Sequence, residues 1–253
     1  MTWRGILHSD ETLNAYHRPP ATYSAGHAVG IIAIDLVYPK LPGNVVNATT
    51  FPFPVLYREV SFDIELLFEG SPEIEDEIVA AARYLERQGV RAIIGACGYF
   101  AHFQEKVSAA VDVPVFLSSL CQLPLIKLGL PTDRKIAVFA ASGDNLDSRI
   151  LEQVGAHEDD LVVQDVGSLE SFSSIRWGRE ELDNAALTRD LSALAADLVR
   201  DHPEVGAVLL ECSDLPPYAC EIQRACGLPV FDFITLIKWV HTAVVQQPYY
   251  GYF

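Results

Sequence analysis

Residues 90–116, VRAIIGACGYFAHFQEKVSAAVDVPVF, align without a gap with residues 205–231, VGAVLLECSDLPPYACEIQRACGLPVF. A shift of 115 residues brings Cys97 onto Cys212. Each copy reads as an apolar strand that ends in a cysteine, a helix, and a Pro-Val-Phe strand that begins seventeen residues after the cysteine. Such a repeat predicts two similar α/β halves. Each thiol then lies just past the carboxyl end of a parallel strand, where ligands bind in folds of this kind.

The rest of the chain extends this alternation. Apolar runs typical of buried strands lie at 29–34, 54–60, 91–96, 114–117, 135–140, 161–165 and 206–211. The stretches typical of helices are 72–88, 101–111, 120–129, 144–154, 179–201, 216–226 and 233–245. Short buried strands separated by helices favour βαβ units and therefore parallel sheets.

The composition is that of a globular protein with a strong acidic excess. The 253 residues include 34 Asp and Glu against 18 Lys and Arg, a formal net charge of −16. This charge disfavours a nucleic-acid partner, because phosphate backbones are bound by clustered Lys and Arg. No apolar run approaches the roughly 20 residues that span a bilayer, and the N-terminus lacks the apolar stretch of a secretory signal. We therefore expect a cytoplasmic protein without a nucleic-acid or membrane partner.

The five cysteines form neither a CxxC pair nor a metal-ligand spacing, and there is no HExxH motif. We therefore predict no metal site and no disulfide framework. A lone cysteine is most often a small buried hydrophobe, which is our interpretation of Cys121, Cys220 and Cys226. The repeat favours a functional role for Cys97 and Cys212, although a duplication would also preserve a cysteine that only packs.

Two thiols that face each other across a cleft suit proton transfer at a carbon next to a carboxyl or carbonyl group. One thiolate removes the proton from one face, and the other thiol returns a proton to the opposite face. This inverts a stereocentre without a cofactor, provided that the pKa values of the two thiols are pushed apart. The helix after each cysteine offers free N–H groups that favour a thiolate and bind a carboxylate.

The duplicated cysteine resembles that of the aspartate/glutamate racemase superfamily, which includes glutamate, aspartate and hydantoin racemases, arylmalonate decarboxylase and maleate isomerase. The resemblance covers residues 28–245 and rests on the strand-end motifs Ile34-Asp35-Leu36, Ala96-Cys97-Gly98-Tyr99 and Glu211-Cys212-Ser213-Asp214. It implies an α/β fold of two pseudo-symmetric Rossmann-like lobes with parallel sheets, and an active site in the cleft between them. We expect an N-terminal arm over 1–27, lobe 1 over 28–118 plus 232–253, and lobe 2 over 119–231.

The resemblance also suggests roles for individual residues. It implies that Cys97 and Cys212 are the acid/base groups and that Asp35 orients Cys97 or receives its proton. The candidate substrate-binding residues are Gly98, Tyr99, Ser118, Ser142, Gly143, Ser213 and Asp214. Simpler roles stay open, since Asp35, Asp214 and the serines also suit loop or helix caps and Tyr99 suits a buried structural position. In a fold of this kind the loop 38–54 suits a cover over the site, where Lys40, Asn47 or Thr50 would neutralise a second carboxyl group. It suits a plain surface loop or an oligomer contact equally well.

The motifs depart from those of glutamate racemases at the positions that hold the amino acid. Those enzymes carry Asp-Ser, Cys-Asn-Thr and Cys-Thr-His where this chain has Asp35-Leu36, Cys97-Gly98-Tyr99 and Cys212-Ser213-Asp214. Because both thiols are retained, we expect a cofactor-independent racemase or epimerase of a small carboxylate. This carboxylate is expected to be an amino acid such as aspartate or glutamate, or a derivative. The alternatives are maleate-isomerase-like or decarboxylase chemistry, and a non-catalytic small-ligand binding protein. The aromatic tail 248–253 suggests a subunit contact in a homo-oligomer.

Overall fold

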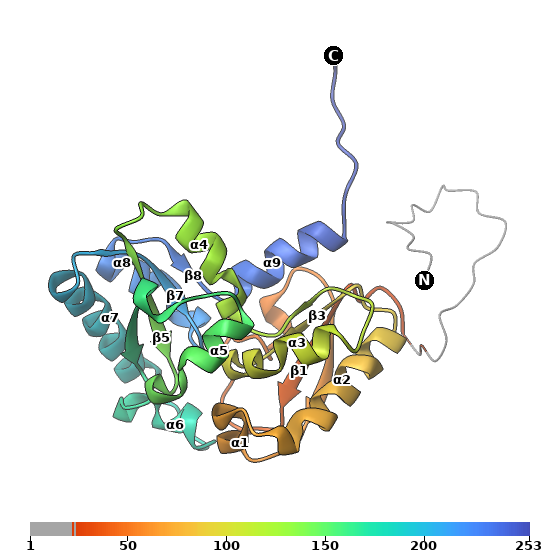
Figure 1. Cartoon of the computed structure of the whole chain (residues 1–253), viewed down its shortest axis with the longest axis horizontal. Helices are drawn as coiled ribbons and strands as arrows, with labels where there is room; N and C mark the ends of the chain where they lie inside the picture. Colours follow the sequence, from red (N-terminus) through yellow and green to blue (C-terminus); the bar gives the residue numbers. More distant parts are fainter. Residues whose placement is uncertain (1–21, 23) are drawn as a thin grey trace.

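Two parallel four-stranded sheets form the frame of the computed structural model, which describes residue 22 and residues 24–253 (Figure 1). The first sheet contains β1 (Val29–Ile34), β2 (Val55–Val60), β3 (Ala92–Gly95) and β4 (Val115–Phe116), in the order β2-β1-β3-β4. The second contains β5 (Lys135–Ala140), β6 (Leu161–Asp165), β7 (Val205–Leu210) and β8 (Val230–Phe231), in the order β6-β5-β7-β8. The α/β fold expected from the sequence is therefore confirmed. The predicted N-terminal arm lies largely outside the described residues, and the lobe boundaries stay predictions.

The sequence repeat is reproduced in the strand register. Ile93 pairs with Val115 in the first sheet, and the equivalent Val208 pairs with Val230 in the second. The two sheets also share one order of strands. In each, the strand that precedes the cysteine, β3 or β7, is an inner strand. The repeat therefore describes two copies of one βαβ arrangement, and each copy sends its cysteine to the same kind of strand end.

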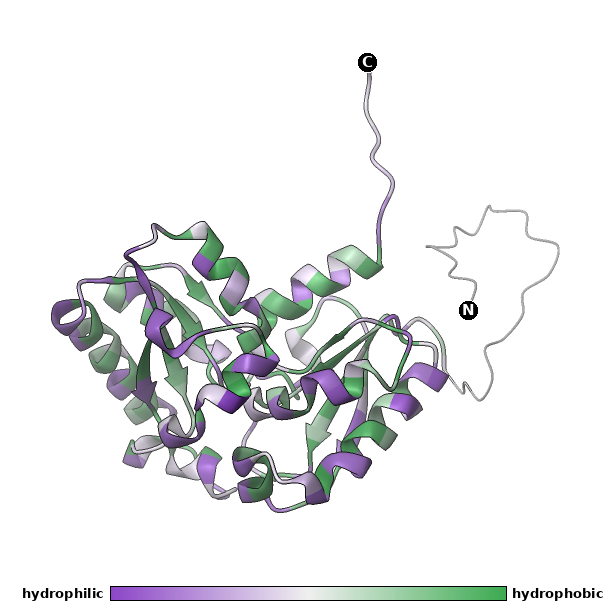
Figure 2. Cartoon of the chain, viewed as in Figure 1, coloured by the Kyte–Doolittle hydropathy of each residue, from purple (hydrophilic) through white to green (hydrophobic). Residues whose placement is uncertain are grey.

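The helices flank both sheets, and the strands consist mainly of hydrophobic residues (Figure 2). The helices are α1 (Ile64–Glu69), α2 (Glu75–Arg87), α3 (Gln104–Ser108), α4 (Leu123–Gly129), α5 (Ser148–Gln153), α6 (Ser173–Arg176), α7 (Asn184–Asp201), α8 (Ala219–Cys226) and α9 (Phe233–Val244). Helix α9 covers one face of the first sheet, where Phe233, Leu236 and Ile237 pack with β1 and β3 residues in a separate core cluster. Among the helices of the described residues, none combines the length and apolar character that a bilayer span requires.

The strand predictions are accurate to about one residue, whereas several helices are shorter than expected. The predicted helix 101–111 is a 3₁₀ segment, Gly98–Phe103, followed by the short α3. The predicted helix 144–154 begins only at Ser148, because the Asp147 carboxylate caps the N–H groups of Arg149 and Ile150. Helices α1 and α6 were not predicted, since four to six residues are too few to show a helical period.

Helix α9 is anchored at its start by a reciprocal cap. The Asp232 carboxylate accepts from the Thr235 N–H at 2.7 Å, and the Thr235 hydroxyl accepts from the Asp232 N–H at 2.9 Å. The Gln122 amide donates to the Asp232 carbonyl at 2.9 Å, which ties the cap to the segment before α4. The cap therefore fixes how α9 lies on the first sheet.

We expect Asp232→Ala to lower the free energy of unfolding by about 1–2 kcal/mol, the usual cost of a lost N-cap. Urea unfolding followed by circular dichroism measures this change. Asp76→Ala, at an exposed position of α2, is the matched control and should change stability by less than about 0.5 kcal/mol. An equal effect of both substitutions would contradict the role of the cap.

Candidate active site

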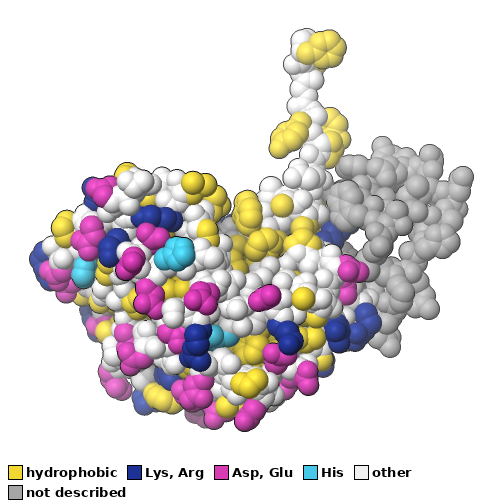
Figure 3. All heavy atoms as spheres, in the orientation of Figure 1, with side chains coloured by type: hydrophobic (Ala, Val, Ile, Leu, Met, Phe, Trp, Pro, Cys, Tyr) yellow, Lys and Arg dark blue, Asp and Glu magenta, His cyan; other side chains and the backbone are white. Residues whose placement is uncertain are grey.

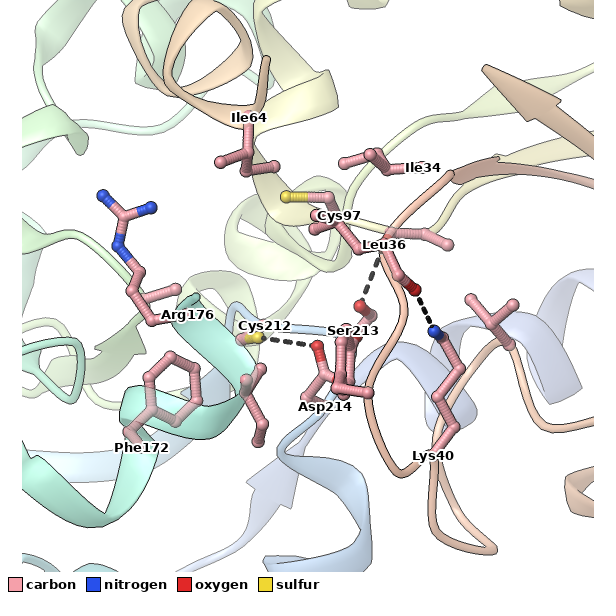
Figure 4. Close-up of a pocket in the computed structure, with 15 residues that line it drawn as sticks. Ile34, Leu36, Lys40, Ile64, Cys97, Phe172, Arg176, Cys212, Ser213 and Asp214 are labelled. Atoms are coloured by element: carbon pink, nitrogen blue, oxygen red, sulfur yellow. Dashed lines mark hydrogen bonds between the residues drawn. The ribbon is translucent and has the colours of Figure 1, made fainter. Parts of the chain in front are cut away.

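The two duplicated cysteines line one cavity where the carboxyl ends of the two sheets meet (Figure 4). Cys97 follows β3 and Cys212 follows β7, and the exposed fractions of these residues are 9% and 6%. The cavity has a volume of about 50 Å³, room for a few water molecules or one small ligand. The structure therefore brings together the two residues that the repeat singled out, 115 positions apart in sequence.

Cys212 belongs to a buried hydrogen-bonded cluster. Its Sγ donates to Oδ2 of Asp214 at 3.5 Å. The other carboxylate oxygen, Oδ1, accepts from the Tyr38 hydroxyl at 2.7 Å and from the Asn44 amide. Tyr38 and Asn44 come from the long loop after β1, and the Val45 N–H of that loop donates to the Ser213 carbonyl at 3.3 Å. The loop thus closes over the second thiol and fixes the carboxylate that accepts its proton.

Burial controls the ionisation of these groups. It raises the pKa of the Cys212 thiol well above its usual range, and the Asp214 and Glu211 carboxylates raise it further. Burial likewise raises the pKa of the Cys97 thiol, with Glu211 as the next largest cause. The pKa of Asp214 is also raised by burial, although the hydrogen bonds from Tyr38 and Cys212 act against this. Both thiols are therefore protonated at rest, and Cys212 donates its hydrogen bond to Asp214.

Two cationic side chains line the same cavity. Arg176, at the end of α6, forms a bidentate pair with Glu65 of α1, with Nη1–Oε1 at 2.8 Å and Nη2–Oε2 at 3.1 Å. Its guanidinium lies 4.3 Å from the Phe68 ring centre. Lys40 donates from Nζ to the Leu36 carbonyl and lies 4.1 Å from the Tyr38 ring centre. Burial lowers the pKa of Lys40, and attraction to Asp214 opposes this.

A buried carboxyl group that the sequence analysis did not select also lies here. Glu211 directly precedes Cys212, has no exposed surface, and accepts from the Ala141 N–H through Oε2 at 2.9 Å. Burial raises its pKa to about 8. The buried position of Glu211 could have been predicted from the sequence. Glu211 is an acidic residue at the end of the apolar run VGAVLL, where the other copy has Ala96.

Of the predicted substrate-binding residues, Ser213 and Asp214 line the cavity. The Ser213 hydroxyl donates to the Ala96 carbonyl at 2.8 Å and so links the ends of the two sheets. Asp35, predicted to act beside Cys97, is instead exposed at the end of β1 and is not among the cavity-lining residues, because the next residue, Leu36, turns inward in its place.

The remaining predicted residues support the site without lining it. Tyr99 is fully buried, and its hydroxyl accepts from the Ser142 N–H at 3.1 Å. This hydroxyl is therefore already hydrogen-bonded to the backbone. Ser142 accepts from the Asn145 amide through Oγ at 2.8 Å. Gly143 donates its N–H to Asp165 at 3.3 Å, and Ser118 caps the Leu120 N–H at 3.1 Å. Ser118 therefore has the simpler capping role considered for it, whereas the Ser142 side chain bonds to a side-chain amide and makes no cap hydrogen bond to the backbone.

The loop after β1 contributes one of its three predicted residues to the cavity. Lys40 lines it. Asn47 instead caps the Thr49 N–H at 2.9 Å, and the Thr50 hydroxyl donates to the Asn44 carbonyl at 2.8 Å, so both shape the loop. Within the described part of the chain, no group of three or more His, Cys, Asp and Glu residues is arranged to hold a metal ion.

We expect Tyr38→Phe to destabilise the protein by about 1–3 kcal/mol, because Asp214 then keeps its buried charge with one donor fewer. Urea unfolding at pH 7 measures this change. Tyr249→Phe, in the exposed C-terminal tail, removes a hydroxyl from solvent and should leave stability unchanged. A Tyr38→Phe variant as stable as wild type would show that Tyr38 does not hold an ionised Asp214.

The sequence of this chain matches a known protein family and several named relatives. The model of the Asp/Glu/hydantoin racemase family matches residues 62–239. A relative named dimethylsulfoniopropionate lyase, from Durusdinium sp. clade D, is 32% identical over 233 residues, which cover 88% of this chain and 77% of the relative. Dimethylsulfoniopropionate lyase 3 from Emiliania huxleyi is also 32% identical, over 88% of this chain but 61% of its own length.

Solved structures share the fold at low sequence identity. Unliganded arylmalonate decarboxylase has a TM-score of 0.56 and 18% identity, covering 89% of this chain and 97% of that one. A glutamate racemase from Bacillus anthracis has a TM-score of 0.56 and 15% identity, covering 87% of this chain and 85% of that one. At these identities the likeness concerns the fold alone.

Proposed function

Because this chain belongs to the Asp/Glu/hydantoin racemase family, we propose that it is a cofactor-independent lyase acting on dimethylsulfoniopropionate or a closely related sulfonio-carboxylate. The observation that carries the proposal is the Cys212–Asp214 hydrogen bond in a cavity that also presents cationic side chains. The names of the similar relatives support a lyase rather than the isomerase expected from the sequence. Cleavage of a carbon–sulfur bond was not among the alternatives that the sequence suggested.

The reaction is a β-elimination. The enzyme base removes a proton from the carbon next to the substrate carboxylate, and that electron pair forms a carbon–carbon double bond. The bond from the neighbouring carbon to the sulfonium sulfur breaks and returns its electrons to sulfur. The products are acrylate and neutral dimethyl sulfide, with the proton left on the base. The sulfide needs no proton to depart, so a single base is sufficient.

Cys212 is the best supported base. As its sulfur takes the substrate proton, its own proton moves to Asp214 along the 3.5 Å hydrogen bond, so no free thiolate has to exist beforehand. Arg176 and Lys40 are placed to bind the carboxylate, and their charge stabilises the negative charge that develops there. The Phe172 ring lines the cavity and is available to the sulfonium cation, whereas the Tyr38 ring already contacts the Lys40 ammonium. Cys97 completes the cavity opposite Cys212 as a neutral thiol.

Racemisation is the second candidate, favoured by the presence of both thiols on one cavity. It begins with the same proton removal but ends when the second thiol returns a proton to the other face. The two reactions differ in what they demand of Cys97. Elimination needs it as part of the cavity wall, whereas inversion needs it as an acid.

We expect the protein to release dimethyl sulfide from dimethylsulfoniopropionate, measured by headspace gas chromatography. Cys212→Ser and Asp214→Asn should each lower the rate at least about 10²-fold, the usual contribution of a general base. Cys97→Ser should lower it much less, and Cys220→Ser, at an exposed position, should not change it.

Proton exchange at carbon in D₂O, with both enantiomers of aspartate, glutamate and a 5-substituted hydantoin, tests the second candidate on the same variants. Exchange with inversion that is lost in both Cys97→Ser and Cys212→Ser would establish racemisation. Full dimethyl sulfide release by the Cys212→Ser variant would contradict the proposal that Cys212 is the base.

The expected homo-oligomer has a candidate surface along α4 and α9. Leu128 and Trp239 are 83% and 54% exposed there, and Figure 3 shows hydrophobic side chains gathered over α9. Residues 113–132 and 233–253 contain no Asp or Glu, although the chain has 34 of them. Two copies with a net charge of −16 therefore approach with least repulsion through this face.

We expect the wild-type protein to sediment as an oligomer and Leu128→Asp to sediment as a monomer, measured by analytical ultracentrifugation. Val163→Asp, at a half-exposed position of β6, is the control and should stay oligomeric. A monomeric wild-type protein, or an oligomer that persists in Leu128→Asp, contradicts this surface.

A further inference from the structure

The Glu211 carboxyl group lies at the junction of both cysteine segments. Its backbone N–H donates to the Phe139 carbonyl at 3.0 Å, and its carbonyl accepts from the Ser119 hydroxyl at 3.1 Å. These bonds fix the residue at the end of the second sheet, directly before Cys212. Its side chain reaches across to the segment that follows Cys97, so one carboxyl group borders both thiol-bearing segments.

The glycine at position 98 shows how closely this carboxyl group approaches the segment that follows Cys97. A Cβ atom at position 98 would lie 1.9 Å from Oε1 of Glu211, far inside van der Waals contact. Position 98 therefore accepts only glycine while Glu211 keeps its place. This explains Gly98 better than the substrate contact expected from the sequence. The Gly98 N–H lowers the pKa of Glu211, although Oε1 of this carboxyl group has no hydrogen-bond partner of regular geometry among the described residues.

The surroundings of Glu211 contain several acidic groups and little that compensates a negative charge. Cys97 and Tyr99 face it from the first sheet, and Cys212 and Asp214 follow it in sequence. The neutral partners are the backbone N–H groups of residues 98 and 141. Among the described residues, no Lys or Arg forms an ion pair with Glu211, and Arg176 is paired with Glu65. An ionised Glu211 would thus add a second buried carboxylate beside Asp214.

We propose that Glu211 is a positioning residue that stays protonated in the working enzyme, so that the site holds a single negative charge for Cys212 and Asp214 to share. Loss of the Glu211 proton places a second negative charge beside both thiols. This charge suppresses their ionisation and repels the negative charge that develops on the substrate carboxylate, so that elimination stops. The effect on turnover rests on the proposed function, whereas the effect on thiol ionisation and on stability does not.

The pH range of this switch follows from burial, which raises the pKa of Glu211 to about 8. An unfolded chain loses this proton near pH 4.5, whereas the folded chain keeps it until about pH 8. The folded state therefore binds more protons between these values, and stability falls as the pH rises through that interval. Glu211→Gln has the same shape without the ionisation, so it should lack this part of the pH dependence.

The test compares wild type with Glu211→Gln, and uses Glu221→Gln on the exposed side of α8 as the matched control. The rate of alkylation by iodoacetamide, which is proportional to the thiolate fraction of each cysteine, is followed from pH 6 to 10, with Cys97→Ser and Cys212→Ser identifying each thiol. We expect Glu211→Gln to form thiolate at a pH at least about one unit lower than wild type, which is tenfold more thiolate at a given pH. Dimethyl sulfide release by wild type should fall at alkaline pH. The pH of this fall should be higher in Glu211→Gln and unchanged in Glu221→Gln.

A thiol titration in Glu211→Gln that coincides with wild type would overturn the inference, as would loss of thiol ionisation in that variant. Infrared spectra of wild-type protein carrying isotope-labelled glutamate give a second measurement that needs no variant. A protonated glutamate band at pH 7 that disappears near pH 8 to 9 supports the inference, and its absence at pH 7 overturns it. If no dimethyl sulfide is released, the proposed function fails while the thiol and infrared results still decide the role of Glu211.

Discussion

The exclusion of water from the ends of two parallel sheets is the constraint on which the chemistry of this protein depends. In water, Cys212 and Asp214 would ionise independently. In the cavity, burial raises the pKa of both, and the Cys212 thiol donates a hydrogen bond to Asp214 at 3.5 Å. Under the proposed function, this thiol and this carboxylate act together as one base. Coulombic interactions are stronger in such a site, so each additional charge there has a large effect.

Contacts between the two halves of the site hold this arrangement in place. The Ser213 hydroxyl bonds to the Ala96 carbonyl, and the Glu65–Arg176 pair joins α1 to α6 across the cavity. These bonds connect segments that are more than 100 residues apart, so the distance between the thiols is set by the packing of the halves. Under the proposed function, a substrate carboxylate bound by Arg176 would share its guanidinium with Glu65.

The sequence predicts the fold and the two thiols because both follow from local patterns. Apolar runs and an exact 115-residue shift suffice to locate β3, β7 and the cysteines behind them. Tyr38 and Arg176 were not found, because they reach the cavity from a long loop and from a four-residue helix whose paths depend on tertiary packing. Asp35 was misplaced for the same reason, since a strand-end residue points into the site or away from it according to how the chain turns after the strand.

The distinction between racemase and lyase within one family also has a physical basis. Both reactions begin by removing a proton beside a carboxylate, and the resulting carbanion takes the fastest path open to it. A substrate with a sulfonium group on the neighbouring carbon offers a neutral leaving group, so elimination competes strongly with return of a proton. A substrate without such a group leaves only reprotonation, which requires an acid on the opposite face. The same pair of thiols could therefore serve either outcome. Under the proposed function, the residues that line the cavity beside the cation, Phe172 and Asp214, would select the substrate.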